Sequence, residues 1–158
     1  MRLRSASSGH SQVTLNRITL LIERAVEGRA VQHPPRILLV EAELSLRHTL
    51  ALILQQSGYA VTTAYQARDT LRYADAQAYD LIFLDIDRVG PRSTDLLQTI
   101  CRLSPDIPML ILAASPAIEQ INAAGPVEHR AYLFKPIDPA KVLVCIRDLL
   151  DRSLPPAS

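Results

Sequence analysis

Apolar and polar positions along the chain form blocks that predict strands and helices in alternation. Short apolar runs predict five buried strands, at 36–40, 60–64, 80–85, 107–113 and 131–134. Apolar residues spaced three and four positions apart predict a helix after each strand, at 44–57, 67–78, 94–103, 117–124 and 139–152. Gly58 is placed to end the first of these helices, and Asp138 is placed to cap the last. Strands alternating with helices predict one parallel α/β sheet with right-handed crossovers.

A further amphipathic helix is predicted before the first strand, over residues 14–27. Its apolar positions share one stripe and are Leu15, Ile18, Leu21, Ile22, Ala25 and Val26. This helix is too short for a stable free coiled coil, so it is expected to pack against its own domain, a second copy or another partner. The run His33-Pro34-Pro35 predicts a linker. We therefore expect a mobile N-terminus with helix and linker at 1–35, the main domain at 36–152 and a tail at 153–158.

Composition and charge narrow the class of partner. Hydrophobic residues make up 48% and charged residues 21% of the chain, as in an ordinary globular domain. The net charge of +1 provides no broad electrostatic footprint for nucleic acid. No apolar run approaches the ~18 residues that span a bilayer. From the net charge we expect no nucleic-acid partner, and from the short apolar runs we expect no membrane partner. Two cysteines, Cys101 and Cys145, do not form a disulfide framework and favour a reducing cytoplasm.

Charged residues stand where the predicted strands end. Glu41 follows the first strand, Asp85 ends the third and Lys135 follows the fifth, while Ala113 ends the fourth. The carboxyl ends of parallel strands meet at one edge of an open sheet, where such folds place their functional groups. Charges at the ends of buried strands are costly unless they pair or bind something. The sequence therefore predicts a site in which two carboxylates and one lysine converge.

Four segments resemble the receiver domain of bacterial response regulators, the phosphoacceptor module of two-component signalling. They are Ile37 to Glu43 followed by Arg47, Asp80 to Asp85, Pro108 to Ala114, and Tyr132 to Pro136. The resemblance covers about residues 36–150. It implies a flavodoxin-like, doubly wound sheet of five parallel strands in the order 2-1-3-4-5.

The resemblance also implies roles for individual residues. Asp85 would accept a phosphoryl group from a phosphohistidine on a histidine kinase. Mg²⁺, held by the acidic residues after the first strand, by Asp85 and by the backbone carbonyl of Asp87, would neutralise the repulsion between two anions. Lys135 would supply a second positive charge. A Thr or Ser at position 113 would bind the phosphoryl group, and Tyr132 would follow it inward.

The chain departs from the family pattern at the positions that carry this chemistry. Ala42 replaces the second acidic residue, and Glu43, one position later, is turning into the helix. Ala113 lacks the hydroxyl group, although Ser115 lies two residues beyond it. The loop after Asp85 and the early end of the fourth predicted helix also differ, and Glu128 stands where a Gly is usual. These departures predict a degenerate receiver that keeps its fold and binds Mg²⁺ weakly, at Glu41, Asp85 and Asp87.

Other interpretations of the same residues remain open. Lys135 and Asp85 form either a structural ion pair or part of a phosphoacceptor site. With no hydroxyl group at Ala113, Tyr132 is interpreted as a core aromatic. The arginines Arg88 and Arg92 flank the site, and a solvated loop is the favoured interpretation. The histidines show no ligand spacing and are expected at the surface; they are His10, His33, His48 and His129.

Three functions compete on this basis. The favoured one is a stand-alone signalling adaptor that binds a kinase, a downstream protein or a second copy of itself, with phosphorylation at Asp85 weakened or lost. Its binding surface would be the fourth helix, fifth strand and last helix of the receiver, or the N-terminal helix. The alternative is a single-domain response regulator that accepts phosphate on Asp85. A flavodoxin-like enzyme is disfavoured, because no Gly-rich loop follows the first strand.

Overall fold

The computed structural model describes residues 33–73, 79–87, 93–114 and 129–153. Within these ranges strands and helices alternate, as predicted, and the residues from Pro34 onward belong to one compact unit. The strands are β1 (Arg36–Val40), β2 (Ala60–Ala64), β3 (Leu81–Asp85), β4 (Met109–Ala113) and β5 (Arg130–Phe134). The helices are α2 (Leu44–Gln56), α3 (Ala67–Tyr73), α4 (Ser93–Leu103) and α6 (Pro139–Ser153). The predicted helices at 14–27 and 117–124 lie outside the described residues.

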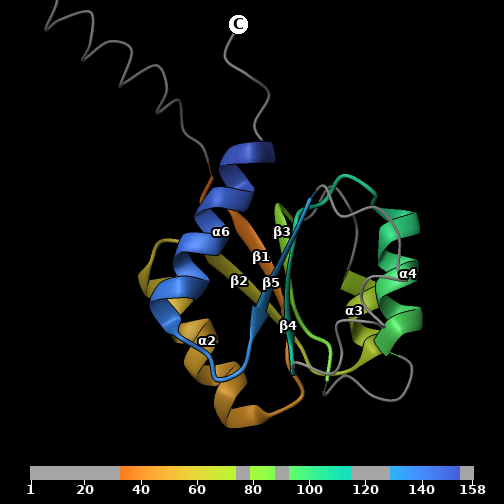
Figure 1. The fold of residues 1–158 in the computed structure, drawn as a ribbon, viewed down its shortest axis with the longest axis horizontal. Helices are drawn as coiled ribbons and strands as arrows, with labels where there is room; N and C mark the ends of the chain where they lie inside the picture. Colours follow the sequence, from red (N-terminus) through yellow and green to blue (C-terminus); the bar gives the residue numbers. More distant parts are fainter. Residues whose placement is uncertain (1–32, 74–78, 88–92, 115–128, 154–158) are drawn as a thin grey trace, which may run out of the picture. The chain divides into compact units, whose positions relative to one another are not determined.

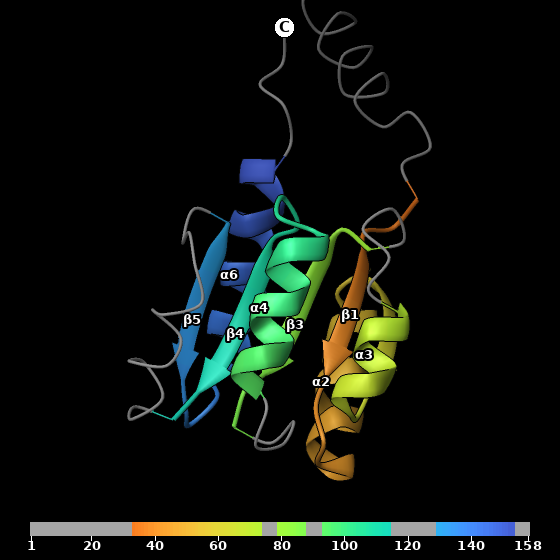
Figure 2. The ribbon, with the colours of Figure 1, turned by 90° about the vertical axis from the view of Figure 1, so that its right-hand side faces the viewer.

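The strands form one parallel sheet in the order β2-β1-β3-β4-β5, which confirms the predicted topology. Helices α2 and α6 cover one face of this sheet, and α3 and α4 cover the other (Figures 1 and 2). Strand β3 is central: its Leu84 pairs with Val40 on β1 and with Ile111 on β4. None of the helices in the described ranges is long and apolar enough to cross a membrane.

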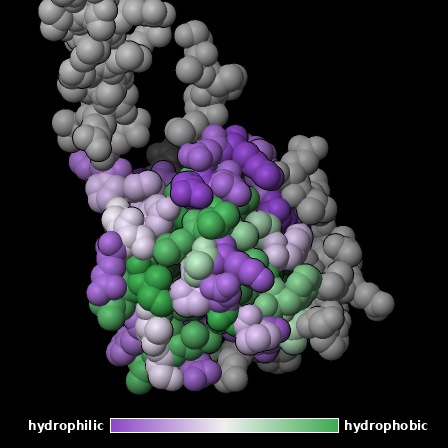
Figure 3. Space-filling view, turned by 60° about the vertical axis from the view of Figure 1, so that its left-hand side comes forward, coloured by the Kyte–Doolittle hydropathy of each residue, from purple (hydrophilic) through white to green (hydrophobic). Residues whose placement is uncertain are grey.

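Alternate residues of β3 point into two separate cores. Phe83 packs in the cluster under α2 and α6, whereas Ile82 and Leu84 pack in the cluster under α3 and α4. All three side chains are completely buried. Burial of each such side chain contributes about 1.5–3 kcal/mol relative to exposure. The face of the molecule shown in Figure 3 mixes apolar and polar residues. In the domain as described, exposed apolar side chains include Leu52 on α2 and Val144 on α6.

Some element ends differ from the prediction by one or two residues. Strand β4 begins at Met109 rather than at 107, because Pro108 has no N–H group to donate to a ladder. Strand β3 begins at Leu81 rather than at 80. The side chain of Asp80 accepts a hydrogen bond from the Arg36 N–H group on its Oδ2 at 2.6 Å, just before the strand. The predicted cap of the last helix is confirmed: Asp138 Oδ1 accepts the Ala140 N–H group at 2.9 Å.

Helix α2 ends where the sequence pattern placed its stop. Gly58 adopts a φ of +94°, the left-handed conformation that glycine adopts without strain. The helix begins after Glu43, which occupies the N-cap position without a side-chain cap. The first turn of α2 thus follows directly on the carboxyl end of β1, where the functional residues begin.

Candidate functional site

Asp85 ends the central strand, and its side chain is only 1% exposed. Its Oδ1 accepts the backbone N–H group of Asp87 at 3.0 Å. Its Oδ2 lies 2.6 Å from the Lys135 ammonium, but this contact is an ion pair that is poorly aligned as a hydrogen bond. One oxygen of Asp85 therefore accepts a backbone hydrogen bond, and the other faces one cation, Lys135, among the described residues.

Glu41 is the second buried carboxyl group of the site. Its backbone N–H group donates to the Ala64 carbonyl at 3.0 Å, which extends the pairing of β1 and β2 by one residue. Oε1 accepts the Glu43 N–H group at 2.8 Å, and Oε2 has no hydrogen-bond partner among the described residues. Burial raises the pKa of Glu41 from 4.5 to about 7, with a further rise from Asp85 that the Glu43 N–H group and Lys135 partly offset. At neutral pH this group is therefore only partly ionised.

Lys135 joins two carboxylates from the other side. Its Nζ lies 2.6 Å from Asp85 Oδ2 and 3.2 Å from Asp87 Oδ2. Burial alone would lower the pKa of Lys135, but the nearby carboxylates of Asp85 and Asp87 outweigh burial and raise it. Lys135 is therefore an ammonium ion at any physiological pH. The ion pair considered from the sequence is present in the structure.

Asp87 has a second partner that the sequence did not indicate. Its Oδ2 accepts the Ala114 N–H group at 2.7 Å, just beyond the end of β4. The resemblance assigned only the backbone carbonyl of Asp87 to the site. Its carboxylate instead links the ends of β3, β4 and β5, and only a side-chain conformation could have revealed this.

The turn between β1 and α2 is held by Arg47. Its Nη1 donates to the carbonyl oxygens of Glu41 at 2.7 Å and of Ala42 at 3.1 Å. The guanidinium group lies 5.6 Å from the centroid of the Tyr65 ring, within the range of a cation–π contact. Ala42 itself is exposed, and Glu43 Oε1 accepts a hydrogen bond from Ser45 Oγ at 3.0 Å. The turn thus carries one buried acid, Glu41, and a methyl group beside it.

The two predicted switch positions lie on neighbouring strands. Ala113 is completely buried, and its carbonyl oxygen accepts the Lys135 N–H group at 3.3 Å. Tyr132 pairs with Ile111 and packs against the core cluster under α4, as expected for a core aromatic. Its hydroxyl group is buried and has no hydrogen-bond partner in the described part of the chain.

Several residues named from the sequence do not enter the described site. Ser115, Arg88, Arg92, Glu128 and His10 lie outside the described residues. His33 and His48 are exposed and His129 is half-buried.

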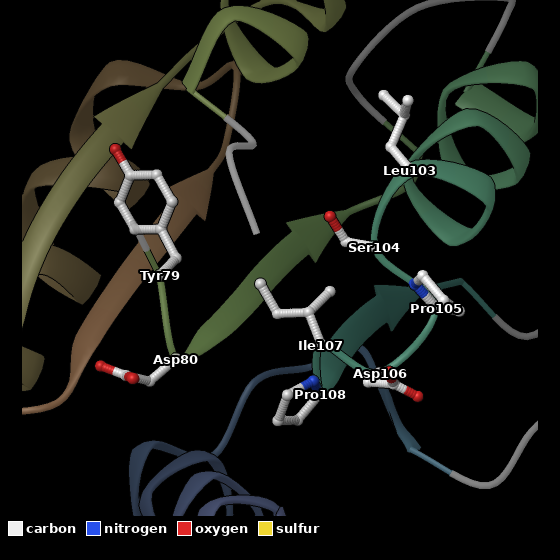
Figure 4. Close-up of a pocket in the computed structure, with 8 residues that line it drawn as sticks. All are labelled: Tyr79, Asp80, Leu103, Ser104, Pro105, Asp106, Ile107 and Pro108. Atoms are coloured by element: carbon white, nitrogen blue, oxygen red, sulfur yellow. The ribbon is translucent and has the colours of Figure 1, made fainter. Parts of the chain in front are cut away.

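A pocket of about 230 Å³ lies at the opposite edge of the sheet, where Asp80 and Pro108 precede β3 and β4 (Figure 4). Because it opens at the amino ends of the strands, it is separate from the carboxyl-end site.

The donor set meets only part of the requirement for Mg²⁺. Glu41 and Asp85 offer buried carboxyl oxygens, and the unpartnered Glu41 Oε2 is the most available of them. Within the described ranges, however, no three Asp, Glu, His or Cys side chains gather closely enough to hold a metal ion. Ala42 adds no oxygen ligand, whereas a hard divalent cation needs six, supplied by carboxylates, carbonyls or waters. Among the described residues, Glu41 and Asp85 are thus the buried carboxyl groups that could ligate a divalent ion.

Comparisons with known proteins identify the family. The family model of the response regulator receiver domain matches residues 37–147, and the chain belongs to this family. It is 30% identical over 122 residues to the transcriptional regulatory protein GlrR of Escherichia coli (strain K12), covering 77% of this chain and 28% of that protein. It is 33% identical over 126 residues to BaeR of Escherichia coli O6:H1, covering 78% of this chain and 51% of that regulator.

A solved CheY-like receiver domain from Methanospirillum hungatei has a similar fold. It matches with a TM-score of 0.67 and 25% identity, covering 76% of this chain and 96% of that one. This confirms the flavodoxin-like class. The chain spans about half or less of the length of the curated relatives named above. Receiver domains are signalling modules that interact with histidine kinases and commonly bind Mg²⁺ at the phosphorylation site.

Proposed function

We propose that this chain is an atypical receiver that acts in two-component signalling through protein–protein binding, with phosphorylation at Asp85 weakened or lost. The observation that carries the proposal is the pair of alanines at the site. Ala42 follows the buried Glu41 at the end of β1, and the buried Ala113 ends β4. Neither side chain supplies an oxygen ligand to Mg²⁺ or a hydroxyl group to a phosphoryl group.

Charge explains why these two positions matter. A carboxylate that attacks a phosphoryl group brings two anions together, and catalysis of that step is chiefly charge neutralisation and positioning. In the described part of the chain, Lys135 is the cation that contacts Asp85, and it also contacts Asp87. Burial raises the pKa of Glu41 to about 7, so a divalent ion gains less from ionising this group than from an exposed carboxylate. The site therefore lacks much of the neutralising charge that the transfer needs.

The alternative is a phosphorylation-competent receiver that accepts phosphate on Asp85 from a histidine kinase. It is supported by the retained acceptor geometry: Asp85 Oδ2 has no hydrogen bond from the described residues and lies beside Lys135. Both proposals give Asp85 the same position in the site, and they differ in whether Asp85 accepts a phosphoryl group at a useful rate.

Partners follow from the proposed class. We propose a histidine kinase or a downstream signalling protein as the partner, or a second copy of this chain, in the bacterial cytoplasm. Phe134 on β5 is 45% exposed and Val144 on α6 is 47% exposed, and these two apolar side chains support docking through β5 or α6. The same proposal keeps 1–35, 36–152 and 153–158 as the N-terminal segment, the receiver domain and the tail of this chain.

Labelling with acetyl phosphate in the presence of Mg²⁺ tests the proposal. The wild type, Asp85→Asn and the double variant Ala42→Asp/Ala113→Thr would be compared by intact-protein mass. We expect little labelling of the wild type and clear labelling of the double variant. Stable labelling of the wild type that Asp85→Asn abolishes would establish the alternative. Circular dichroism of each variant confirms that the fold is retained.

A further inference from the structure

The carboxylate of Asp87 holds two donors of the site at once. Its Oδ2 lies 2.7 Å from the Ala114 nitrogen and 3.2 Å from Lys135 Nζ. These donors stand just beyond the ends of β4 and β5, on the same side of the central strand. The Asp87 side chain is 24% exposed, so it is ordered by these contacts and not by burial.

The two donors are those that an anionic group on Asp85 would require. Asp85 Oδ1 is already engaged by the Asp87 N–H group, which leaves Oδ2 as the oxygen able to form a new bond. Lys135 Nζ lies 2.6 Å from that oxygen. In transfer from acetyl phosphate, the bond from Oδ2 to phosphorus forms as the bond from phosphorus to acetate breaks, and acetate leaves with the electron pair. The new phosphoryl oxygens would then lie beside Lys135.

We propose that Asp87 is a resident anion of this site, whose carboxylate occupies Lys135 Nζ and the Ala114 N–H group and so competes with any phosphoryl group on Asp85. This inference rests on the proposed function, because it adds a cause to the weakened phosphorylation. The competition is local and charge-assisted: one oxygen accepts from an ammonium and from a backbone amide. An incoming tetrahedral anion gains the Ala114 N–H group only by displacing Asp87, and it competes with Asp87 for the three N–H donors of Lys135.

Sulfate, a tetrahedral dianion, provides a test that needs neither Mg²⁺ nor phosphoryl transfer. The parent is the full chain carrying Asp85→Asn, which removes the repelling carboxylate and the acceptor chemistry. Asp87→Ala and Asp87→Asn are added to this parent separately. Sulfate is titrated while the Ala114 amide resonance is followed by ¹⁵N NMR. Asp138→Asn is the matched control, because it removes one negative charge three residues after Lys135 while Asn still caps α6.

The expected result is a gain in anion affinity confined to the Asp87 variants. Freeing a charge-assisted donor pair should tighten sulfate binding by about tenfold or more in Asp87→Ala. The gain should be smaller in Asp87→Asn, because its amide oxygen still accepts from Ala114. The Ala114 resonance should also move in both variants before sulfate is added.

Two results would overturn the inference. One is a sulfate affinity of both Asp87 variants that stays within about twofold of the parent. The other is an equal gain in the Asp138→Asn control, which would indicate a general charge effect. Labelling of the wild type by acetyl phosphate is judged separately, so the proposed function can fail while the role of Asp87 stands, and the reverse.

Discussion

Lys135 lies 2.6 Å from Asp85, and the two residues differ sharply in exposure: 27% for the lysine side chain and 1% for the aspartate. The lysine follows the edge strand β5 and the aspartate ends the central strand β3. The contact joins a partly exposed cation to a buried anion. Removing the lysine therefore leaves the buried Asp85 carboxylate without its neutralising charge, which is the costlier of the two losses.

The first prediction concerns this ion pair. Lys135→Ala should lower the free energy of unfolding by about 2 kcal/mol at pH 7, because it leaves the buried Asp85 charge unpaired. Asp85→Asn added to Lys135→Ala should restore part of the loss. Urea unfolding measures both changes.

The matched control for this prediction is Lys141→Ala, at the only other lysine of the chain, which is exposed. The raised pKa of Lys135 means that its contribution is complete below the ordinary lysine pKa of 10.5 and is lost as the pH rises through the higher folded value. Equal losses in the two lysine variants at pH 7 would contradict the prediction.

The second prediction is a pH dependence that comes from Glu41. The pKa of Glu41 is 4.5 for an ordinary exposed glutamate, as in the unfolded chain, and about 7 in the folded protein. Between these two pH values the folded state holds the proton and the unfolded state does not. The free energy of unfolding should therefore fall as the pH rises from about 4.5 to 7, by up to about 3 kcal/mol. Glu41→Gln should flatten this part of the profile and be more stable than the wild type at pH 8.

Thermal unfolding between pH 5 and pH 8 checks the Glu41 prediction. Gln can keep the hydrogen bond that Oε1 accepts from Glu43, so the comparison isolates the charge. Asp106→Asn, at an exposed loop position on the opposite edge of the sheet, controls for a general change in net charge. A Glu41→Gln profile parallel to that of the wild type would refute the assignment.

The third prediction concerns Mg²⁺. The wild type should bind it only in the millimolar range, and Ala42→Asp should tighten binding by about tenfold or more, because affinity for a hard cation rises with the number of charged oxygen ligands. Titration followed through the Asp87 amide resonance by NMR measures this directly. Tight binding by the wild type would show that Glu41 and Asp85 suffice.

The fourth prediction tests the core that supports the site. Leu84→Ala should lower the free energy of unfolding by about 2–5 kcal/mol, because the Leu84 side chain on β3 is completely buried in the core cluster under α3 and α4. Leu103→Ala removes the same atoms from a residue that is 60% exposed, and should change stability by less than about 1 kcal/mol. Chemical unfolding of the two variants side by side provides the comparison.

The sheet was predictable from the sequence because buried parallel strands produce unbroken apolar runs. Residues 81–84 are apolar throughout and are completely buried in the structure. The convergence of Glu41, Asp85 and Lys135 was equally predictable, since the topology alone brings the carboxyl ends of β1, β3 and β5 to one edge. Strand ends were less exact, because an apolar pattern records neither the N–H group that Pro108 lacks nor the hydrogen bond that Asp80 accepts from Arg36.

The contacts of Asp87 and Arg47 could not be predicted in the same way. Both sets of contacts depend on side-chain conformations in or beside turns, where no periodic pattern in the sequence fixes the direction in which a side chain points. Asp87 reaches Ala114 across 27 positions of sequence. Arg47 was noted only as part of a motif, yet it binds two carbonyl oxygens of the β1–α2 turn. The raised pKa of Glu41 likewise results from complete burial, which its position after a strand suggests but does not fix.

The order of the strands also decides which half of the site can move. Strand β3 is hydrogen-bonded on both sides and wholly buried, whereas β5 pairs with β4 alone among the described strands and is only half-buried. Local opening begins where backbone groups are least protected, so amide hydrogen exchange should be faster along β5 than along β3. Fluctuations of the edge would then withdraw the lysine while the aspartate keeps its position, and the ion pair would open long before the domain unfolds.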